Sequence, residues 1–162
     1  MRRYGVAIAI VIFGGWVAVD GMNPPPSVPP GDLGVLQGNW KPLQVEFEGK
    51  TQMTAEEMSK VTSVYDQAEY HLYYADKGMN PPKVLKLAVM NVSLDSSTSP
   101  KSISFVYASG PLKGQKRHGI YELAGNQLKL CYGPGDKPKP TTFSAPDKSG
   151  YFLEVWARQP MK

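Results

Sequence analysis

The side chains best suited to chemistry are two histidines and their charged neighbours. His71 stands two residues after Glu69 on one expected strand, so both side chains point to the same face and could make a weak metal pair. A metal site needs three or four converging ligands, and the spacing places no third ligand there. His118 follows Lys116 and Arg117, a basic group that would suit an anion. Polar residues on the outer face of ordinary strands explain both histidines more simply, and we expect no metal.

A serine-based reaction is the other chemistry to consider. Five serines cluster in and around a polar turn: Ser93, Ser96, Ser97, Ser99 and Ser102. Turns are the commonest place for serine, and a serine nucleophile also needs a base and an orienting acid. The sequence shows no nucleophile elbow, phosphate loop or dinucleotide fingerprint. We therefore expect a protein that is not an enzyme and that has no cofactor.

Aromatic and aliphatic side chains give a more suggestive signal. Several fall on alternate positions that would face the interior of a barrel: Tyr70, Leu72, Tyr74, Leu87, Ile103, Phe105, Tyr107, Tyr121, Leu123, Leu128 and Leu130. Buried phenol groups need hydrogen-bond partners, which water or a ligand can supply. These residues are therefore the candidate binding site for a small apolar molecule. The alternative is that the same side chains fill the barrel and leave no pocket.

The elements that must position these side chains are short strands, and one hairpin is defined most sharply. Its turn is Gly125-Asn126, a dipeptide typical of two-residue hairpin loops. That turn pairs Leu123 with Leu128 on one face and Glu122 with Lys129 on the other, where opposite charges attract. The turn and the alternation of side chains thus predict the same register.

Alternating strands continue along most of the chain. The expected strands are residues 38–48, 61–65, 68–75, 84–94, 101–108, 115–124, 127–132 and 151–158. Thr54 and Glu57 form a capping box at the start of a short helix, Ala55–Lys60. Pro42 predicts a bulge or bend in the first strand. The predicted fold class is all-β: an eight-stranded antiparallel up-and-down barrel with one short helix after the first strand.

The N-terminal part differs in composition from the rest. Arg2-Arg3 and the apolar run at 5–19 are typical of a secretory leader, and the run is shorter than the roughly 20 residues of a membrane span. We expect residues 1–21 to be a signal peptide or an N-terminal anchor, residues 22–34 a Pro-rich linker, and residues 35–162 the barrel domain. The protein would be secreted or periplasmic, with membrane contact only if the leader stays uncleaved.

Charge and cysteine content narrow the range of partners. The formal net charge is +4 with the cations scattered, which does not predict a nucleic-acid surface. Cys131 is the only cysteine, so no internal disulfide forms, and its pairing with Ile120 indicates a small apolar residue. If the interior is filled, the loop 133–150 with its lysines is the expected surface for a protein or cell-envelope partner.

Four stretches carry a resemblance to a known family. They are LQGNW at 36–40, GIYEL at 119–123, LKLC at 128–131 and KPTTF at 139–143. Together they resemble an uncharacterised lipocalin-like, calycin-type domain family abundant in planctomycete bacteria, over about residues 36–158. The resemblance implies that Trp40 plugs one end of the barrel and that Arg158, from the closing strand, packs over it. It implies a fold and secretion more than an activity.

Overall fold

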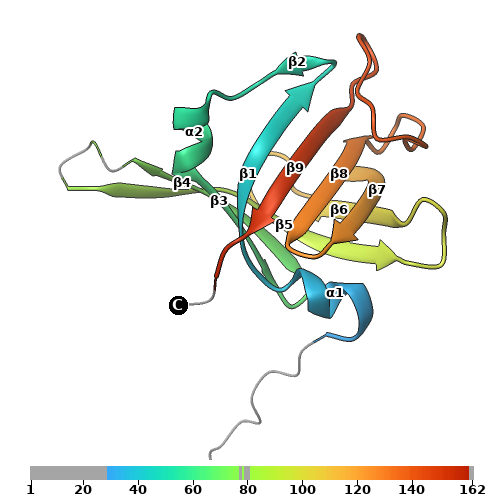
Figure 1. Ribbon diagram of the computed structural model, residues 1–162, viewed down its shortest axis with the longest axis horizontal. Coiled ribbons are helices and arrows are strands. Elements are labelled where there is room, and N and C mark those ends of the chain that lie inside the picture. The colour runs from blue at the N-terminus through green and yellow to red at the C-terminus, as the bar shows by residue number, and fades with distance from the viewer. Residues whose placement is uncertain (1–28, 77, 79–80, 161–162) are drawn as a thin grey trace, which may run out of the picture.

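The chain folds as a meander of antiparallel strands that closes into a barrel (Figure 1). The computed structural model describes residues 29–76, 78 and 81–160. Its elements are α1 (Gly31–Leu36), β1 (Gly38–Phe47), β2 (Lys50–Thr51), α2 (Ala55–Lys60), β3 (Val61–Asp66), β4 (Glu69–Asp76), β5 (Lys83–Asp95), β6 (Ser102–Tyr107), β7 (Lys116–Ala124), β8 (Gln127–Pro134) and β9 (Phe152–Arg158). β1 pairs with β3, each strand from β3 to β8 pairs with the next, and β1 also pairs with β9, so eight strands close the barrel while β2 adds two residues beside β1. The predicted all-β barrel is confirmed.

The β7–β8 hairpin has the register that its turn and its alternation predict. Every pair from Ala124 opposite Gln127 to Ile120 opposite Cys131 is present. Gly125 has φ 59°, a backbone conformation that favours glycine. Cys131 is fully buried and behaves as a small core residue. The hairpin thus fixes the face on which its tyrosine and leucines lie.

The bulge expected at Pro42 is present and lets β1 join two neighbours. The pairing of β1 with β9 shifts register between Pro42 and Gln44, which leaves Leu43 on the surface, 53% exposed. Trp40 and Val45, five residues apart, are therefore both buried. The first residues of β1 pair with β3, and from Trp40 onward β1 pairs with β9, while its last two residues also pair with β2. This bend closes the barrel.

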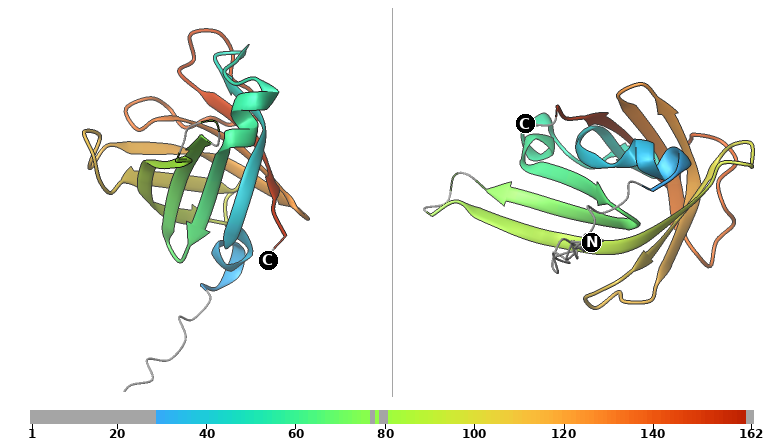
Figure 2. Two further views of the ribbon diagram at one scale, coloured as in Figure 1. Left: turned by 90° about the vertical axis from the view of Figure 1, so that its left-hand side faces the viewer. Right: turned by 90° about the horizontal axis from the view of Figure 1, so that it is seen from below.

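A second helix, α1, precedes the barrel, so the prediction of a single helix is wrong. Its residues 31–34 were expected to belong to the Pro-rich linker, and this part of the boundary prediction is also wrong. Leu36 is fully buried, and Asp32 accepts hydrogen bonds from Lys101 Nζ at 2.8 Å and from Tyr121 OH at 2.7 Å. Figure 2, seen from below, shows α1 lying across this end of the barrel. The leader 1–21 and linker residues 22–28 lie outside the described residues.

The short helix α2 forms as its capping box predicts. Thr54 Oγ1 accepts from the backbone N–H of Glu57, and the Glu57 carboxylate accepts from the backbone N–H of Thr54. In Figure 1, α2 lies away from α1, beside β1 and the start of β3. Neither helix of the described part of the chain is long and apolar enough to span a membrane.

Candidate functional site

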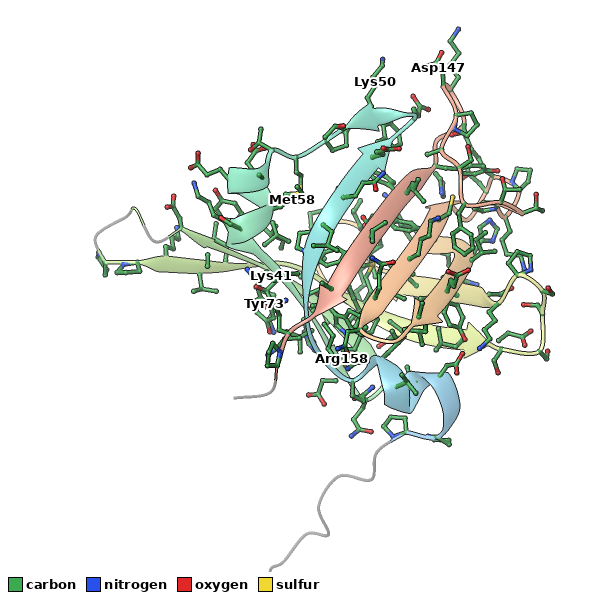
Figure 3. All side chains as sticks on the ribbon, viewed as in Figure 1. Lys41, Lys50, Met58, Tyr73, Asp147 and Arg158 are labelled. Atoms are coloured by element: carbon green, nitrogen blue, oxygen red, sulfur yellow. The ribbon has the colours of Figure 1, made fainter. Side chains whose placement is uncertain are left out.

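Trp40 and Arg158 seal the end of the barrel next to α1, and Figure 3 shows Arg158 beside that helix. The Arg158 guanidinium carbon lies 4.3 Å from the centroid of the Trp40 ring, so the predicted contact is confirmed. Arg158 also donates hydrogen bonds to the backbone oxygens of Gln37 and Val35. Trp40 Nε1 donates to Leu36 O at 2.8 Å. These contacts join the closing strand, the first strand and α1. The side chains at this end of the barrel therefore stabilise the fold.

Ten of the eleven predicted interior residues do belong to the core. Six are buried and four are partly buried against it: Tyr70, Ile103, Phe105, Tyr121, Leu128 and Leu130, with Leu72, Tyr74, Tyr107 and Leu123. The hairpin register and the alternation of side chains were sufficient to place them. A ligand-binding role for these residues stays a prediction.

Leu87 is the exception, and its predicted interior position is wrong. The pairing of β4 with β5 shifts register at this point, because Leu72 pairs with Ala88 while Tyr73 pairs with Lys86. Leu87 therefore has no partner in β4 and lies on the surface, 53% exposed. The bulge also changes which residues of β5 face inward. The core side of β5 is formed by Ala88, Met90, Val92 and Leu94.

The barrel interior is almost completely filled. One cavity of about 30 Å³ lies inside, lined by Tyr70, Met90, Phe105, Tyr107, Arg117, Leu130, Tyr132 and Glu154. This volume suits a single water molecule, whereas pockets for small organic ligands have about 300 Å³ or more. In the described conformation, this cavity has no room for a small apolar molecule.

A buried carboxylate, Glu154, borders this cavity, and the sequence analysis missed it. Tyr132 OH donates to its Oε1 at 2.6 Å, and Trp156 Nε1 donates to its Oε2 at 2.8 Å. Burial raises the pKa of Glu154, while these two hydrogen bonds and the positive charge of Arg117 oppose the rise. One signal could have found it: Arg158 was expected to face inward, and Glu154 lies four residues earlier on the same face of the strand.

Two further hydroxyl groups lie in the core without a partner. Ser63 Oγ and Tyr65 OH are buried and make no hydrogen bond with any described residue. The Tyr65 ring lies 5.1 Å from the Tyr70 ring, centroid to centroid. Burial, followed by the nearby charge of Glu154, raises the pKa of both tyrosines. The core of the barrel thus contains two hydroxyl groups without a hydrogen-bond partner among the described residues, in addition to the Glu154 carboxylate.

Arg117 covers the cavity on the side away from Trp40. Its guanidinium carbon lies 5.9 Å from the centroid of the Tyr107 ring and 5.6 Å from that of Phe152. Arg117 Nε also donates to Tyr107 OH at 3.2 Å. A larger molecule could reach Glu154 from this side only if the Arg117 side chain moved.

An apolar groove lies outside the barrel, next to the β4–β5 hairpin. This hairpin projects well beyond the other strands (Figures 1 and 2). Its Val84, Leu85 and Leu87 are exposed, as is Leu112 in the loop between β6 and β7. Between β5 and that loop lies a groove of about 310 Å³, lined by Lys86, Leu87, Ala88, Val89, Tyr107, Ser109, Gly110, Pro111 and Leu112. We call the four exposed apolar residues Val84, Leu85, Leu87 and Leu112 the apolar rim.

A wider depression beside α2 is polar and internally satisfied. It has about 590 Å³ and is lined mainly by charged and polar residues. Lys60 pairs with Glu56 at 2.9 Å, and Lys41 donates to the backbone oxygens of Ser59 and Val61. Its cations are already engaged, so it is a weaker candidate than the apolar groove.

The two histidines have local structural partners. His71 Nε2 lies 3.1 Å from the Glu69 carboxylate, and its ring stacks near Tyr73. His118 Nε2 is 2.6 Å from Lys137 O, which fastens the loop 133–150 to β7. In the described part of the chain, no three residues among His, Cys, Asp and Glu are grouped so as to hold a metal ion.

The lysines expected to make the loop 133–150 an interaction surface are partly engaged by the barrel. Lys137 Nζ donates to Ser149 O at 3.1 Å, and Lys139 Nζ donates to Ser102 Oγ at 2.6 Å. These bonds hold the loop against its own domain. The loop remains a predicted surface, but the apolar rim is the more accessible one.

Comparisons of the chain with protein-family models, with curated proteins and with solved structures found no match. Its function has to be inferred from its own geometry.

Proposed function

We propose that the protein is a non-enzymatic, lipocalin-like barrel that binds a protein or cell-envelope partner through its apolar rim. The observation that supports this proposal is that the barrel interior holds only a small cavity, whereas apolar side chains are exposed on its outer surface. The cavity inside has only about 30 Å³, while two of the six exposed large hydrophobic residues, Leu87 and Leu112, line one outer groove, and two more, Val84 and Leu85, precede Leu87 on β5. Contiguous apolar side chains on a surface are typical of interaction sites.

The composition around the groove adds to this proposal. Lys86 lines the groove and no aspartate or glutamate does, and the flanking segments 83–85 and 113–116 add Lys83, Lys113 and Lys116. A partner with apolar and acidic groups would match both properties of this surface. If residues 1–21 are the expected secretory leader, the protein would meet such a partner outside the cell or in the periplasm.

A second candidate function is the binding of a small molecule inside the barrel. The unpartnered hydroxyls of Ser63 and Tyr65, close to the buried carboxylate of Glu154, favour it. Such a ligand would need Arg117 to move and the cavity to expand about tenfold to the usual pocket volume. The apolar rim needs no such rearrangement, so we place it first.

A pair of matched variants tests the proposed function. Leu87→Glu places a charge on the apolar rim, and Leu43→Glu does the same at a position of equal exposure, 53%, in the bulge of β1. We expect the fluorescence of a bound apolar dye to fall strongly for Leu87→Glu and to stay unchanged for Leu43→Glu. Equal dye binding by both variants and the wild type would contradict the proposal, and a gain of binding in Arg117→Ala would favour the interior site instead.

A further inference from the structure

We infer that the partner of the apolar rim is an extended peptide segment, apolar at alternate residues and acidic at its flanks, which adds a strand to the free edge of β5. This inference rests on the proposed function and names the kind of partner. Strand addition to an exposed sheet edge is a common mode of peptide recognition, in which main-chain hydrogen bonds give affinity and side-chain pockets give specificity.

The edge of β5 is free because β5 is much longer than its neighbour on that side. β5 has 13 residues and β6 has six. β5 pairs with β4 from Lys83 to Asn91, but with β6 only from Met90 onward. The last backbone hydrogen bond on the β6 side joins Ala108 N–H to Val89 O at 2.9 Å. No described residue pairs with the backbone of residues 83–88 on that side.

The loop after β6 explains why the edge stays open. Tyr107 exchanges backbone hydrogen bonds with Gln115 and Gly114, so the chain turns into β7 instead of continuing along β5. Gly110 and Gly114 have φ of 77° and 85°, which suits a tight reversal. Six unpaired residues at about 3.3 Å each offer an edge of roughly 20 Å. An extended peptide of about six residues fits this length.

The groove beside this edge would take side chains of an added strand. Side chains of a strand alternate between its two faces, so every second residue of a bound peptide would face the groove. Leu87, Val89 and Leu112 contribute apolar surface to its walls, and Tyr107 lies at its inner side. Small or β-branched apolar side chains suit such a surface.

The positive charge beside the free edge of β5 favours a partner with acidic groups. Of the residues that line the groove, Lys86 is basic and none is acidic, and Lys86 Nζ lies 5.5 Å from the centroid of the Tyr73 ring. Two copies of the chain pairing through β5 would bring identical lysines together, and like charges on paired strands repel. Lysines on an exposed edge also discourage pairing between copies. A peptide with acidic flanks removes this repulsion.

The test measures how tightly the full chain binds peptides in which N-methylation blocks the hydrogen bonds of one edge. The probe is fluorescein-labelled Asp-Glu-Val-Thr-Val-Thr-Val-Glu-Asp, with two twins N-methylated either on the three valine amides or on the amides of the two threonines and of the second glutamate. The two twins block opposite edges of the extended peptide while keeping its charge and side chains. We expect the parent and one twin to bind, and the other twin to lose affinity by about tenfold or more, because it cannot donate to β5. Backbone amides of residues 83–88 should exchange hydrogen more slowly in the complex.

Each other outcome overturns the inference in a distinguishable way. Equal binding of all three peptides, still weakened by Leu87→Glu but not by Leu43→Glu, rejects strand addition and leaves the apolar rim as a binding surface. Absence of peptide binding together with dye binding unaffected by Leu87→Glu rejects both the inference and the proposed function. Absence of peptide binding with adsorption to vesicles of anionic phospholipid assigns the rim to a membrane surface. Self-association of the chain, lost in Leu87→Glu, assigns it to a second copy.

Discussion

A double-mutant cycle on Trp40 and Arg158 measures how the barrel is sealed. Trp40→Ala removes a fully buried indole and should cost about 3–5 kcal/mol of unfolding free energy. Arg158→Met removes the guanidinium 4.3 Å from the ring centroid, together with its bonds to the backbone of α1 and the segment after it. Since the ring is buried and the guanidinium is partly exposed, we expect a coupling energy of about 1 kcal/mol, within the range of about 0.5–2 for cation–π pairs. Urea unfolding followed by circular dichroism gives all four free energies.

The control for this cycle is a pair of residues without contact. Arg158→Met combined with Phe105→Ala should be additive within about 0.5 kcal/mol. A Trp40–Arg158 coupling no larger than this, with both single costs present, would show that the cation–π contact adds nothing to the seal. Arg158 would then act only through its hydrogen bonds to the backbone.

Three further predictions follow from the interior and from α1. Phe105→Ala should cost about 3–5 kcal/mol in urea unfolding, as in a filled core; a much smaller cost would indicate that the interior can open for a ligand. The pKa of Glu154 is raised above its ordinary 4.5 by burial, so the folded state keeps a proton that the unfolded chain has lost, and stability should fall as pH rises above about 4.5. Glu154→Gln should remove this dependence from the unfolding midpoint. Hydrogen bonds from Lys101 and then Tyr121 lower the pKa of Asp32 below its ordinary 3.8, so its contribution should be lost as pH falls below about 4, and Asp32→Asn should show no such loss.

The sequence predicted the parts of the fold in which two local signals agree. In the β7–β8 hairpin, the turn residues and the alternation specify the same register, and every predicted pair is present. The helix Ala55–Lys60 could be predicted equally well, because the side chains of Thr54 and Glu57 cap it without contacts from the rest of the chain. Local hydrogen bonding decides such elements, so a single sequence contains enough information to predict them.

Long-range contacts decide the parts that were missed. The helix α1 contains two glycines in six residues and follows a Pro-rich stretch, so its composition indicates a linker. Its Asp32 is fixed by Lys101 and Tyr121, which lie 69 and 89 residues away. Because these partners are distant in sequence, residues 31–36 alone give no signal for the contacts that hold the helix. The helix therefore forms because the barrel end offers polar and apolar partners, which overrides weak local propensity.

The two bulges, at Leu43 and Leu87, lie in different structural settings. A register shift cannot be read from alternation, because one extra residue reverses the face of every side chain beyond it. At Leu43 the shift turns β1 toward β9 and closes the barrel, and the exposed leucine is a by-product of that closure. At Leu87 the shift lies in the part of β5 that does not pair with β6, so this shift does not contribute to closing the barrel. An exposed leucine that closure does not require, beside a backbone edge without a partner, is best explained by a partner that arrives from outside.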